Sequence, residues 1–219
     1  MRKCGRWRGR MSSKIQLILK RLIDVVLSLI GLILLAIPFA IIALVIKLDS
    51  KGSVFFRQER SGQYGKPFTI YKFRTMLDLM DAGGKSLPDE ERLTIVGRFL
   101  RKTGFDELPE LWNVIKGDMS LVGPRPLLIK YMPYYREQER KRFVVCPGIT
   151  GWALVNGRND LPWDKRFEYD IWYIENWSLT LDLKILLLTL FKVALQKNVQ
   201  ILPTLSMMDL DEERRKHDL

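Results

Sequence analysis

Few residues in this sequence could support catalysis through histidine or cysteine. The only histidine is His217, third from the C-terminus, and the only cysteines are Cys4 and Cys146. One terminal histidine argues against a Ser-His-Asp triad, a Cys-His pair and a zinc site built from histidines. Two cysteines, one of them in a basic leader, are too few for a disulfide-stapled secreted domain. Carboxylate chemistry is therefore the most economical route open to this chain.

The positive charge of the chain is unevenly distributed. The 219 residues include 36 Lys and Arg against 25 Asp and Glu, which gives a formal net charge of +11. Residues 1–21 contain eight basic residues and no acid, so the remaining 198 residues carry a net charge of only +3. This distribution predicts a leader that binds anionic membrane lipids, and no nucleic-acid partner.

Residues 22–46 form one long apolar run with a single charge, Asp24. At about 1.5 Å per helical residue, the run is long enough to cross a hydrocarbon core of roughly 30 Å. Pro38 lies inside the run and predicts a kink. A helix broken near Pro38 that enters and leaves by one face would put all the flanking cations on the cytoplasmic side, whereas a kinked spanning helix would not; these cations are Lys20, Arg21, Lys47 and Lys51.

The remaining sequence predicts a mainly α fold with a small β-hairpin. Residues 54–58 and 67–74 are rich in aromatic and β-branched residues and have two glycines between them, which is typical of a hairpin. Residues 93–100 are expected to be helical, and the charged stretch 133–143 is expected to form a helix whose charged side chains face the solvent. Residues 179–195 are strongly apolar but carry three charged residues, which favours an amphipathic helix at the membrane interface or packed on the domain.

The most informative segment is 101–126, RKTGFDELPELWNVIKGDMSLVGPRP. Its apolar residues recur with helical spacing from Leu108 to Ile115, which places Asp106 and Glu107 at the start of a helix. Acidic residues are common there because they accept hydrogen bonds from free backbone N–H groups, so simple capping explains an isolated pair.

The neighbours of this acidic pair favour a phosphate site. Arg101 precedes the pair, and the turn of residues 123–126 fixes Arg125 between two prolines. Guanidinium groups match phosphate oxygens, and carboxylates are suitable ligands for Mg²⁺. Asp106, held ionised by its positive neighbours, could also attack phosphorus directly to form an acyl phosphate. Spacing alone does not separate this chemistry from passive phosphate binding.

Four motifs in order resemble the bacterial sugar transferases, the monotopic phosphoglycosyl transferases, over roughly residues 20–195. They are the apolar run continuing to VFFRQER, then IYKFRTM, then FDELPELWNVIKGDMSLVGPRP, and finally PGITGWALVNGRND. The resemblance implies transfer of a sugar 1-phosphate from a UDP-sugar to undecaprenyl phosphate with release of UMP, as the first membrane step of surface glycan biosynthesis. The length is similar to that of the minimal catalytic form of the family.

The resemblance also implies roles for individual residues. Asp106 matches the nucleophile that forms a phosphosugar-aspartyl intermediate, and Glu107 matches the second member of the dyad, which supports the metal or handles protons. Mg²⁺ is the implied cofactor, with Asp106 and Glu107 as its expected ligands. The candidate residues for binding the substrate phosphates or nucleotide are Lys72, Arg101, Pro124, Arg125 and Arg158.

The family further implies a re-entrant membrane helix and a catalytic domain on the cytoplasmic face of the bacterial inner membrane. One departure is that the break, often Ser-Pro in the family, is Ile37-Pro38 here. The expected parts are a basic leader (1–21), the membrane helix (22–47), the catalytic domain (48–203) and a charged tail (204–219). The sugar is not readable from the sequence, and a homodimer stays open.

Two other functions are compatible with parts of the sequence. A basic, non-catalytic membrane scaffold would explain the leader but has no use for acidic residues placed among cations. A metal-dependent phosphatase or nucleotidyl transferase would use the same carboxylates without an acceptor lipid.

Overall fold

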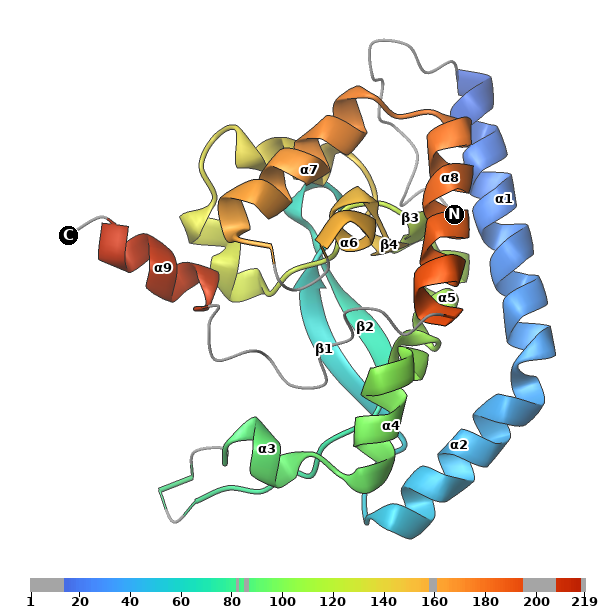
Figure 1. Ribbon diagram of the computed structural model, residues 1–219, viewed down its shortest axis with the longest axis vertical. Helices are drawn as coiled ribbons and strands as arrows, with labels where there is room; N and C mark the ends of the chain where they lie inside the picture. Colours follow the sequence, from blue (N-terminus) through green and yellow to red (C-terminus); the bar gives the residue numbers. More distant parts are fainter. Residues whose placement is uncertain (1–13, 82, 85–86, 158–160, 195–207, 218–219) are drawn as a thin grey trace.

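The computed structural model describes residues 14–81, 83–84, 87–157, 161–194 and 208–217. Its fold is mostly helical, as predicted, with two small sheets, of which the sequence predicted one, and a long bent helix pair runs along one side (Figure 1). The helices are α1 (Lys14–Leu34), α2 (Ala36–Asp49), α3 (Asp89–Arg92), α4 (Ile95–Thr103), α5 (Glu110–Lys116), α6 (Trp152–Gly157), α7 (Trp163–Glu175), α8 (Leu179–Ala194) and α9 (Leu210–His217). The strands are β1 (Phe55–Ser61), β2 (Pro67–Phe73), β3 (Ser120–Val122) and β4 (Gly148–Thr150), and short 3-10 turns cover Gln63–Gly65, Phe105–Glu107, Ile129–Tyr134 and Glu139–Val144.

The apolar N-terminal run forms α1 and α2, which meet at a bend of 60°. The break falls at Leu35, one turn before Pro38. Proline has no N–H to donate to the carbonyl four residues earlier, which here belongs to Leu34, and its ring clashes with that carbonyl. The predicted break near Pro38 is confirmed. Within the described residues no single helix is long and apolar enough to cross a membrane, whereas this bent pair could do so by length and composition.

The predicted hairpin is confirmed as the antiparallel pair β1–β2, in register from Phe55 opposite Phe73 to Ser61 opposite Pro67. The turn between the strands uses two residues with positive φ, Tyr64 and Gly65. Towards its open end the hairpin packs against α2 and α4, since buried Phe73 shares a cluster with Ile46 and Leu100.

The parallel pair β3–β4 was not predicted. Each strand has only three residues, too few to show an alternating pattern, and Ser120 and Val122 pair with Gly148 and Thr150. This small sheet lies between α1, α5 and α8 (Figure 1). It positions the turn that follows β3 and carries Arg125.

The prediction of a solvated helix over residues 133–143 is wrong. The chain forms two 3-10 turns there, one of which contains Pro133. Arg142 and Glu139 are buried, each in an ion pair with a residue of a later helix. The chain here follows the geometry that these buried ion pairs need and does not form a regular α-helix.

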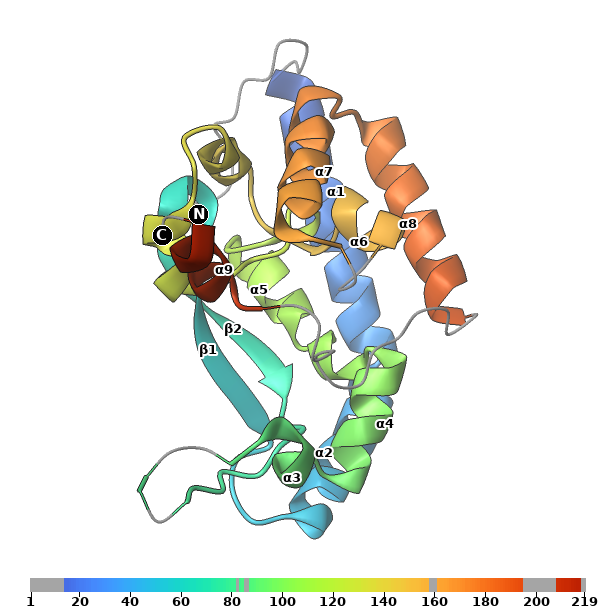
Figure 2. The same ribbon diagram turned by 60° about the vertical axis from the view of Figure 1, so that its left-hand side comes forward.

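Residues 210–217 of the charged tail form α9 and pack on the domain (Figure 2). Leu210 is fully buried, in a cluster that contains Trp163. Arg214 is ion-paired with Glu139 at 2.7 Å and with Asp164 at 2.7 Å. The tail therefore contributes to the core on the side away from α1.

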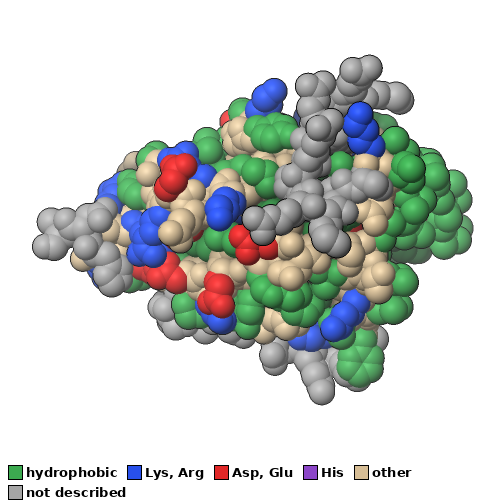
Figure 3. Space-filling model, turned by 90° about the horizontal axis from the view of Figure 1, so that it is seen from above, with side chains coloured by type: hydrophobic (Ala, Val, Ile, Leu, Met, Phe, Trp, Pro, Cys, Tyr) green, Lys and Arg blue, Asp and Glu red, His purple; other side chains and the backbone are tan. Residues whose placement is uncertain are grey.

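Large apolar side chains are exposed along the bent pair and on α8. Figure 3 shows hydrophobic side chains gathered at the end of the molecule where Figure 1 places α1 and α8. Extended exposed apolar surface of this kind is typical of a membrane or protein contact. Among its members are Ile15, Ile18, Ile33, Leu34, Ile37 and Leu48 of the bent pair and Leu183, Leu187, Leu190 and Phe191 of α8.

Candidate active site

The acidic pair lies between two helices rather than on one. Gly104 ends α4 with a positive φ of 75°, and the chain then makes the 3-10 turn Phe105–Glu107. Pro109 follows, and α5 begins at Glu110. The predicted helix after the pair is confirmed, but it starts later than the apolar spacing indicated. The turn brings the Glu107 carboxylate to Lys72 of the hairpin and to Arg125 of the segment after β3.

Glu107 is held by two cations from different parts of the chain. Lys72 of β2 donates to Oε1 at 2.5 Å. Arg125 donates through Nη2 to Oε1 at 2.5 Å and through Nη1 to Oε2 at 3.2 Å. Burial opposes ionisation, but Arg125 and then Lys72 outweigh it and hold the pKa of Glu107 well below its usual range. Glu107 is therefore a permanent carboxylate with both oxygens occupied.

Asp106 is in a different situation. It accepts no hydrogen bond from the part of the chain that the structure describes. Burial and the neighbouring charge of Glu107 raise the pKa of Asp106 to about 6, against the opposing effect of Lys72, Arg125 and Arg101. At pH 7 the group is still mostly ionised, but it is more basic than an ordinary aspartate. Within the described part of the chain it is the carboxylate of the pair without a hydrogen-bond partner, and the charges of Lys72 and Arg125 act on it.

The remaining residues predicted to bind the substrate are Arg101, Pro124 and Arg158, of which the first two relate less directly to the acidic pair. Arg101, in the last turn of α4, donates through Nε to Thr75 Oγ1 at 3.1 Å, and its charge lowers the pKa of Asp106. The carbonyl of Pro124 accepts from the N–H of Gly148 at 3.0 Å, which fixes the turn before Arg125. Arg158 lies outside the described residues.

The Arg125 turn is held from behind by residues that sequence reasoning missed. Buried Arg142 donates to the carbonyl of Arg125 at 2.7 Å. Gly148 passes so close to Gly123 that a Cβ on Gly148 would lie 2.1 Å from the Gly123 nitrogen. Only glycine allows this approach. The glycines of the PGITG motif were the only sign of this close approach in the sequence, which did not show that Gly148 packs against Gly123.

Two further charged groups next to the site were also missed. Glu110 is 3 % exposed and lies 3.4 Å from the Lys72 ammonium. Burial, together with repulsion from Glu107, raises the pKa of Glu110 to about 7 despite the attraction of Lys72. Arg60 of β1 is also near: burial and the charge of Arg125 lower its pKa to about 10. The repeated acid in DELPE was the only sequence signal for Glu110.

The side chains of the site can be compared with those that a divalent cation needs as ligands. Among the described residues no three acidic, histidine or cysteine side chains converge as a metal cluster. Asp106 accepts no hydrogen bond from the described residues and so offers a carboxylate, whereas Glu107 would have to release a cation to bind a metal. Mg²⁺ commonly binds one or two carboxylates and completes its shell with water and substrate phosphates. The site thus fits Mg²⁺ through Asp106, as an ion bound together with a phosphorylated substrate.

Comparison with known proteins agrees with the motifs. A sequence profile described as bacterial sugar transferase matches residues 15–196. The chain is 53% identical over 184 residues to a protein named uncharacterized sugar transferase EpsL from Bacillus subtilis, covering 84% of this chain and 91% of that protein.

Longer relatives carry more specific names. A UDP-glucose:undecaprenyl-phosphate glucose-1-phosphate transferase from Escherichia coli is 43% identical, over 82% of this chain and 41% of its own length. An undecaprenyl-phosphate galactose phosphotransferase from Salmonella typhimurium is 39% identical, also over 82% of this chain and 41% of its own length. The chain thus spans less than half the length of these two proteins.

Proposed function

The chain belongs to the bacterial sugar transferase family, and from this premise we propose that it transfers a sugar 1-phosphate from a UDP-sugar to undecaprenyl phosphate, releasing UMP. The names of the Escherichia coli and Salmonella relatives support this class of acceptor. The product would be a lipid-linked sugar that begins a surface glycan. Which sugar is transferred, and into which glycan, is left open by the proposal.

One observation carries the proposal: among the described residues Asp106 has no hydrogen-bond partner, whereas Glu107 is locked between Lys72 and Arg125. A passive phosphate-binding site would gain nothing from an anion of raised pKa among its cations. A nucleophile gains from it, because a more basic carboxylate forms a stronger bond to phosphorus and is still mostly ionised at neutral pH.

The reaction proceeds in two displacements. In the first, a carboxylate oxygen of Asp106 attacks the phosphorus that carries the sugar, and the bond from that phosphorus to the bridging oxygen breaks. UMP leaves with the electron pair, and the sugar phosphate stays on Asp106 as an acyl phosphate. In the second, a phosphate oxygen of undecaprenyl phosphate attacks the same phosphorus, and Asp106 leaves as a carboxylate. Such a route gives ping-pong kinetics.

The cations around Asp106 supply electrostatic stabilisation. Lys72 and Arg125 are fixed by Glu107 before substrate arrives, so little reorganisation is needed when charge develops on the departing UMP. With both oxygens paired, Glu107 acts by holding these cations rather than by moving a proton. Mg²⁺ bound at Asp106 would neutralise part of the diphosphate charge.

The bent pair α1–α2 is proposed as a re-entrant anchor in the cytoplasmic membrane. Its exposed apolar side chains and those of α8 would enter the lipid, with the basic residues at both ends of the pair on the cytoplasmic side. This places the catalytic domain at the headgroup level. The phosphate of the lipid acceptor lies at the same level, so the acceptor need not be extracted from the membrane.

The test is an assay of UMP release by the membrane-embedded protein with Mg²⁺, undecaprenyl phosphate and a panel of UDP-sugars. We expect multiple turnovers from at least one donor only when the lipid is present, and none from Asp106→Asn. A phosphatase or nucleotidyl transferase would turn over without the lipid. A non-catalytic scaffold would release no UMP from any donor, with wild type and variant indistinguishable.

A further inference from the structure

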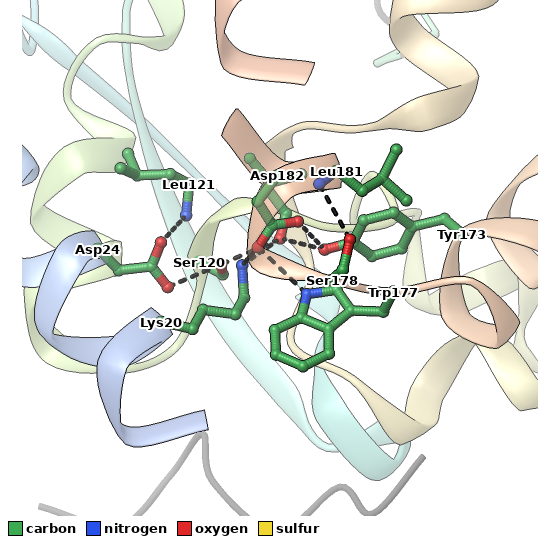
Figure 4. Close-up of polar contacts among 10 residues, drawn as sticks. Lys20, Asp24, Ser120, Leu121, Tyr173, Trp177, Ser178, Leu181 and Asp182 are labelled. Atoms are coloured by element: carbon green, nitrogen blue, oxygen red, sulfur yellow. Dashed lines mark hydrogen bonds and ion pairs between the residues drawn. The ribbon is translucent and has the colours of Figure 1, made fainter. Parts of the chain in front are cut away.

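The first part of α1 makes polar contacts with both segments that carry the active site. Figure 4 shows Lys20 and Asp24, one turn apart on α1, pointing toward β3 and the start of α8. The strand β3 ends at Val122, three residues before Arg125. These contacts are polar although the helix is otherwise apolar, and the proposed catalytic step does not use them.

Asp24 holds β3 directly. Its Oδ2 accepts from the Ser120 hydroxyl at 2.8 Å and its Oδ1 accepts from the Leu121 N–H at 3.2 Å (Figure 4). Asp24 is only 4 % exposed. A carboxylate in the interior is costly unless its partners satisfy it, and here most of those partners belong to one short strand.

Lys20 holds the end of the same strand and connects it to α8. Its ammonium donates to the Val122 carbonyl at 3.2 Å and to Asp182 Oδ2 at 2.6 Å. Asp182 also accepts from the Tyr173 hydroxyl at 2.7 Å and from Trp177 Nε1 at 3.2 Å (Figure 4). The end of β3 is thereby tied to α1, α7 and α8 at once.

Arg21 holds the other segment. It donates through Nη1 to the Val114 carbonyl at 2.7 Å and through Nη2 to the Ile115 carbonyl at 2.9 Å, in the last turn of α5. The last carbonyls of a helix have no partner in the next turn, so a guanidinium is a suitable donor there; at Val114 it adds to the hydrogen bond that the carbonyl accepts from the Gly117 N–H at 3.0 Å. The opposite end of α5 begins three residues after Glu107. The helix α1 therefore contacts the elements on both sides of the Glu107–Arg125 ion pair.

We propose that Lys20, Arg21 and Asp24 are positioning residues that clamp β3 and α5 to α1 and so set the placement of Arg125 relative to Glu107 and Asp106. The proposal rests on the proposed function for the roles of those three active-site residues. It makes catalytic geometry depend on the helix expected to enter the membrane. An apolar helix surface could pack as tightly, but it could not fix the register of backbone donors and acceptors in the same way.

The test compares Asp24→Asn with Ser28→Ala in the full-length, membrane-embedded chain. Asp24→Asn keeps the shape of the side chain but removes its charge and one of the two acceptor oxygens. Ser28 lies one turn further along α1, and its buried hydroxyl has no hydrogen-bond partner among the described residues. Ser28→Ala thus controls for a change on the same helix without loss of a contact to β3.

We expect Asp24→Asn to lower kcat/KM for lipid-dependent UMP release by about ten- to a hundredfold, since small displacements of catalytic groups have effects of this size. Ser28→Ala should change it less than threefold. In an Arg125→Lys background, Asp24→Asn should add less than threefold, because the group it positions is already altered. An equal factor in both backgrounds, or an equal loss from Ser28→Ala, would overturn the proposal.

Amide hydrogen exchange tests the clamp without catalysis. In Asp24→Asn, the peptide covering residues 122–127 should exchange at least tenfold faster than in wild type, whereas Ser28→Ala should leave it unchanged. Unchanged exchange in Asp24→Asn would contradict the clamp. If the wild type releases no UMP, the proposed function fails, and the exchange measurement alone decides whether α1 positions this segment.

Discussion

Replacing Glu107 by glutamine tests how the carboxylate pair divides its roles. Glu107 accepts three charge-assisted hydrogen bonds, one from Lys72 and two from Arg125. Such bonds contribute about 1.5–3 kcal/mol each, and glutamine keeps one acceptor oxygen, so one or two are lost. The three side chains are less than a third exposed, so solvent screens them only in part. We expect the rate of the first displacement to fall about a hundredfold, equivalent to about 2.7 kcal/mol.

The same substitution should shift the pH dependence in a defined direction. Burial and the charge of Glu107 raise the pKa of Asp106 to about 6, and the nucleophile must be ionised. In the wild type the rate should therefore fall about tenfold per pH unit below pH 6. Removing the negative charge of Glu107 lowers the pKa of Asp106, so this acid limb should move to lower pH.

The assay is the single-turnover burst of UMP from a UDP-sugar without lipid, measured from pH 5 to pH 8. Omitting the lipid removes the titration of its phosphate from the profile. Glu110→Gln is the control: its pKa is about 7, so Glu110 is mostly neutral near pH 6 and glutamine resembles it. An acid limb that stays in place or moves to higher pH in Glu107→Gln would refute the reasoning.

Three further outcomes follow from the structure. Arg142→Ala leaves a fully buried carboxylate without its partner, so the free energy of unfolding measured by denaturant titration should fall by about 3–5 kcal/mol; a change below 1 kcal/mol would contradict the packing. Gly148→Ala should reduce UMP release more than tenfold, because its Cβ would lie 2.1 Å from a backbone nitrogen, whereas Gly83→Ala should not. Single cysteines replacing Lys14 and Lys51 should react with an impermeant reagent from the same side of the membrane, and labelling from opposite sides would rule out the re-entrant helix.

Local patterns in the sequence were enough to predict some of the elements near the active site. The apolar spacing from Leu108 to Ile115 predicted α5, and the aromatic, β-branched stretches predicted the β1–β2 hairpin. Pro38 predicted the bend, because the loss of one N–H acts within a single turn. Short-range physical effects such as these are visible in a single sequence.

The missed features depend on partners far along the chain. Arg142 appeared to lie on a solvated face because its partner, Asp170, is 28 residues away. The strands β3 and β4 are too short to show a period, and Leu210 lies between two aspartates in the charged tail. The burial of each is decided by tertiary contacts, which a linear pattern does not contain.

The difference in ionisation between Asp106 and Glu107 could also be seen only in the structure. Both are acids in one short motif, and the sequence indicated that positive neighbours would keep Asp106 ionised. The structure pairs Lys72 and Arg125 with Glu107, so at Asp106 burial and the charge of Glu107 outweigh the cations and raise its pKa. The geometry thereby separates a free, basic carboxylate from one that orders cations.

The most direct test of the central claim is mass spectrometry of the intact protein after incubation with a UDP-sugar substrate and Mg²⁺ in the absence of lipid. The proposed mechanism predicts a mass increase of one sugar phosphate that maps to Asp106, disappears when undecaprenyl phosphate is added, and is absent from Asp106→Asn. Lipid-dependent turnover without any adduct in rapidly quenched samples, or an adduct on another residue that persists in Asp106→Asn, would contradict it.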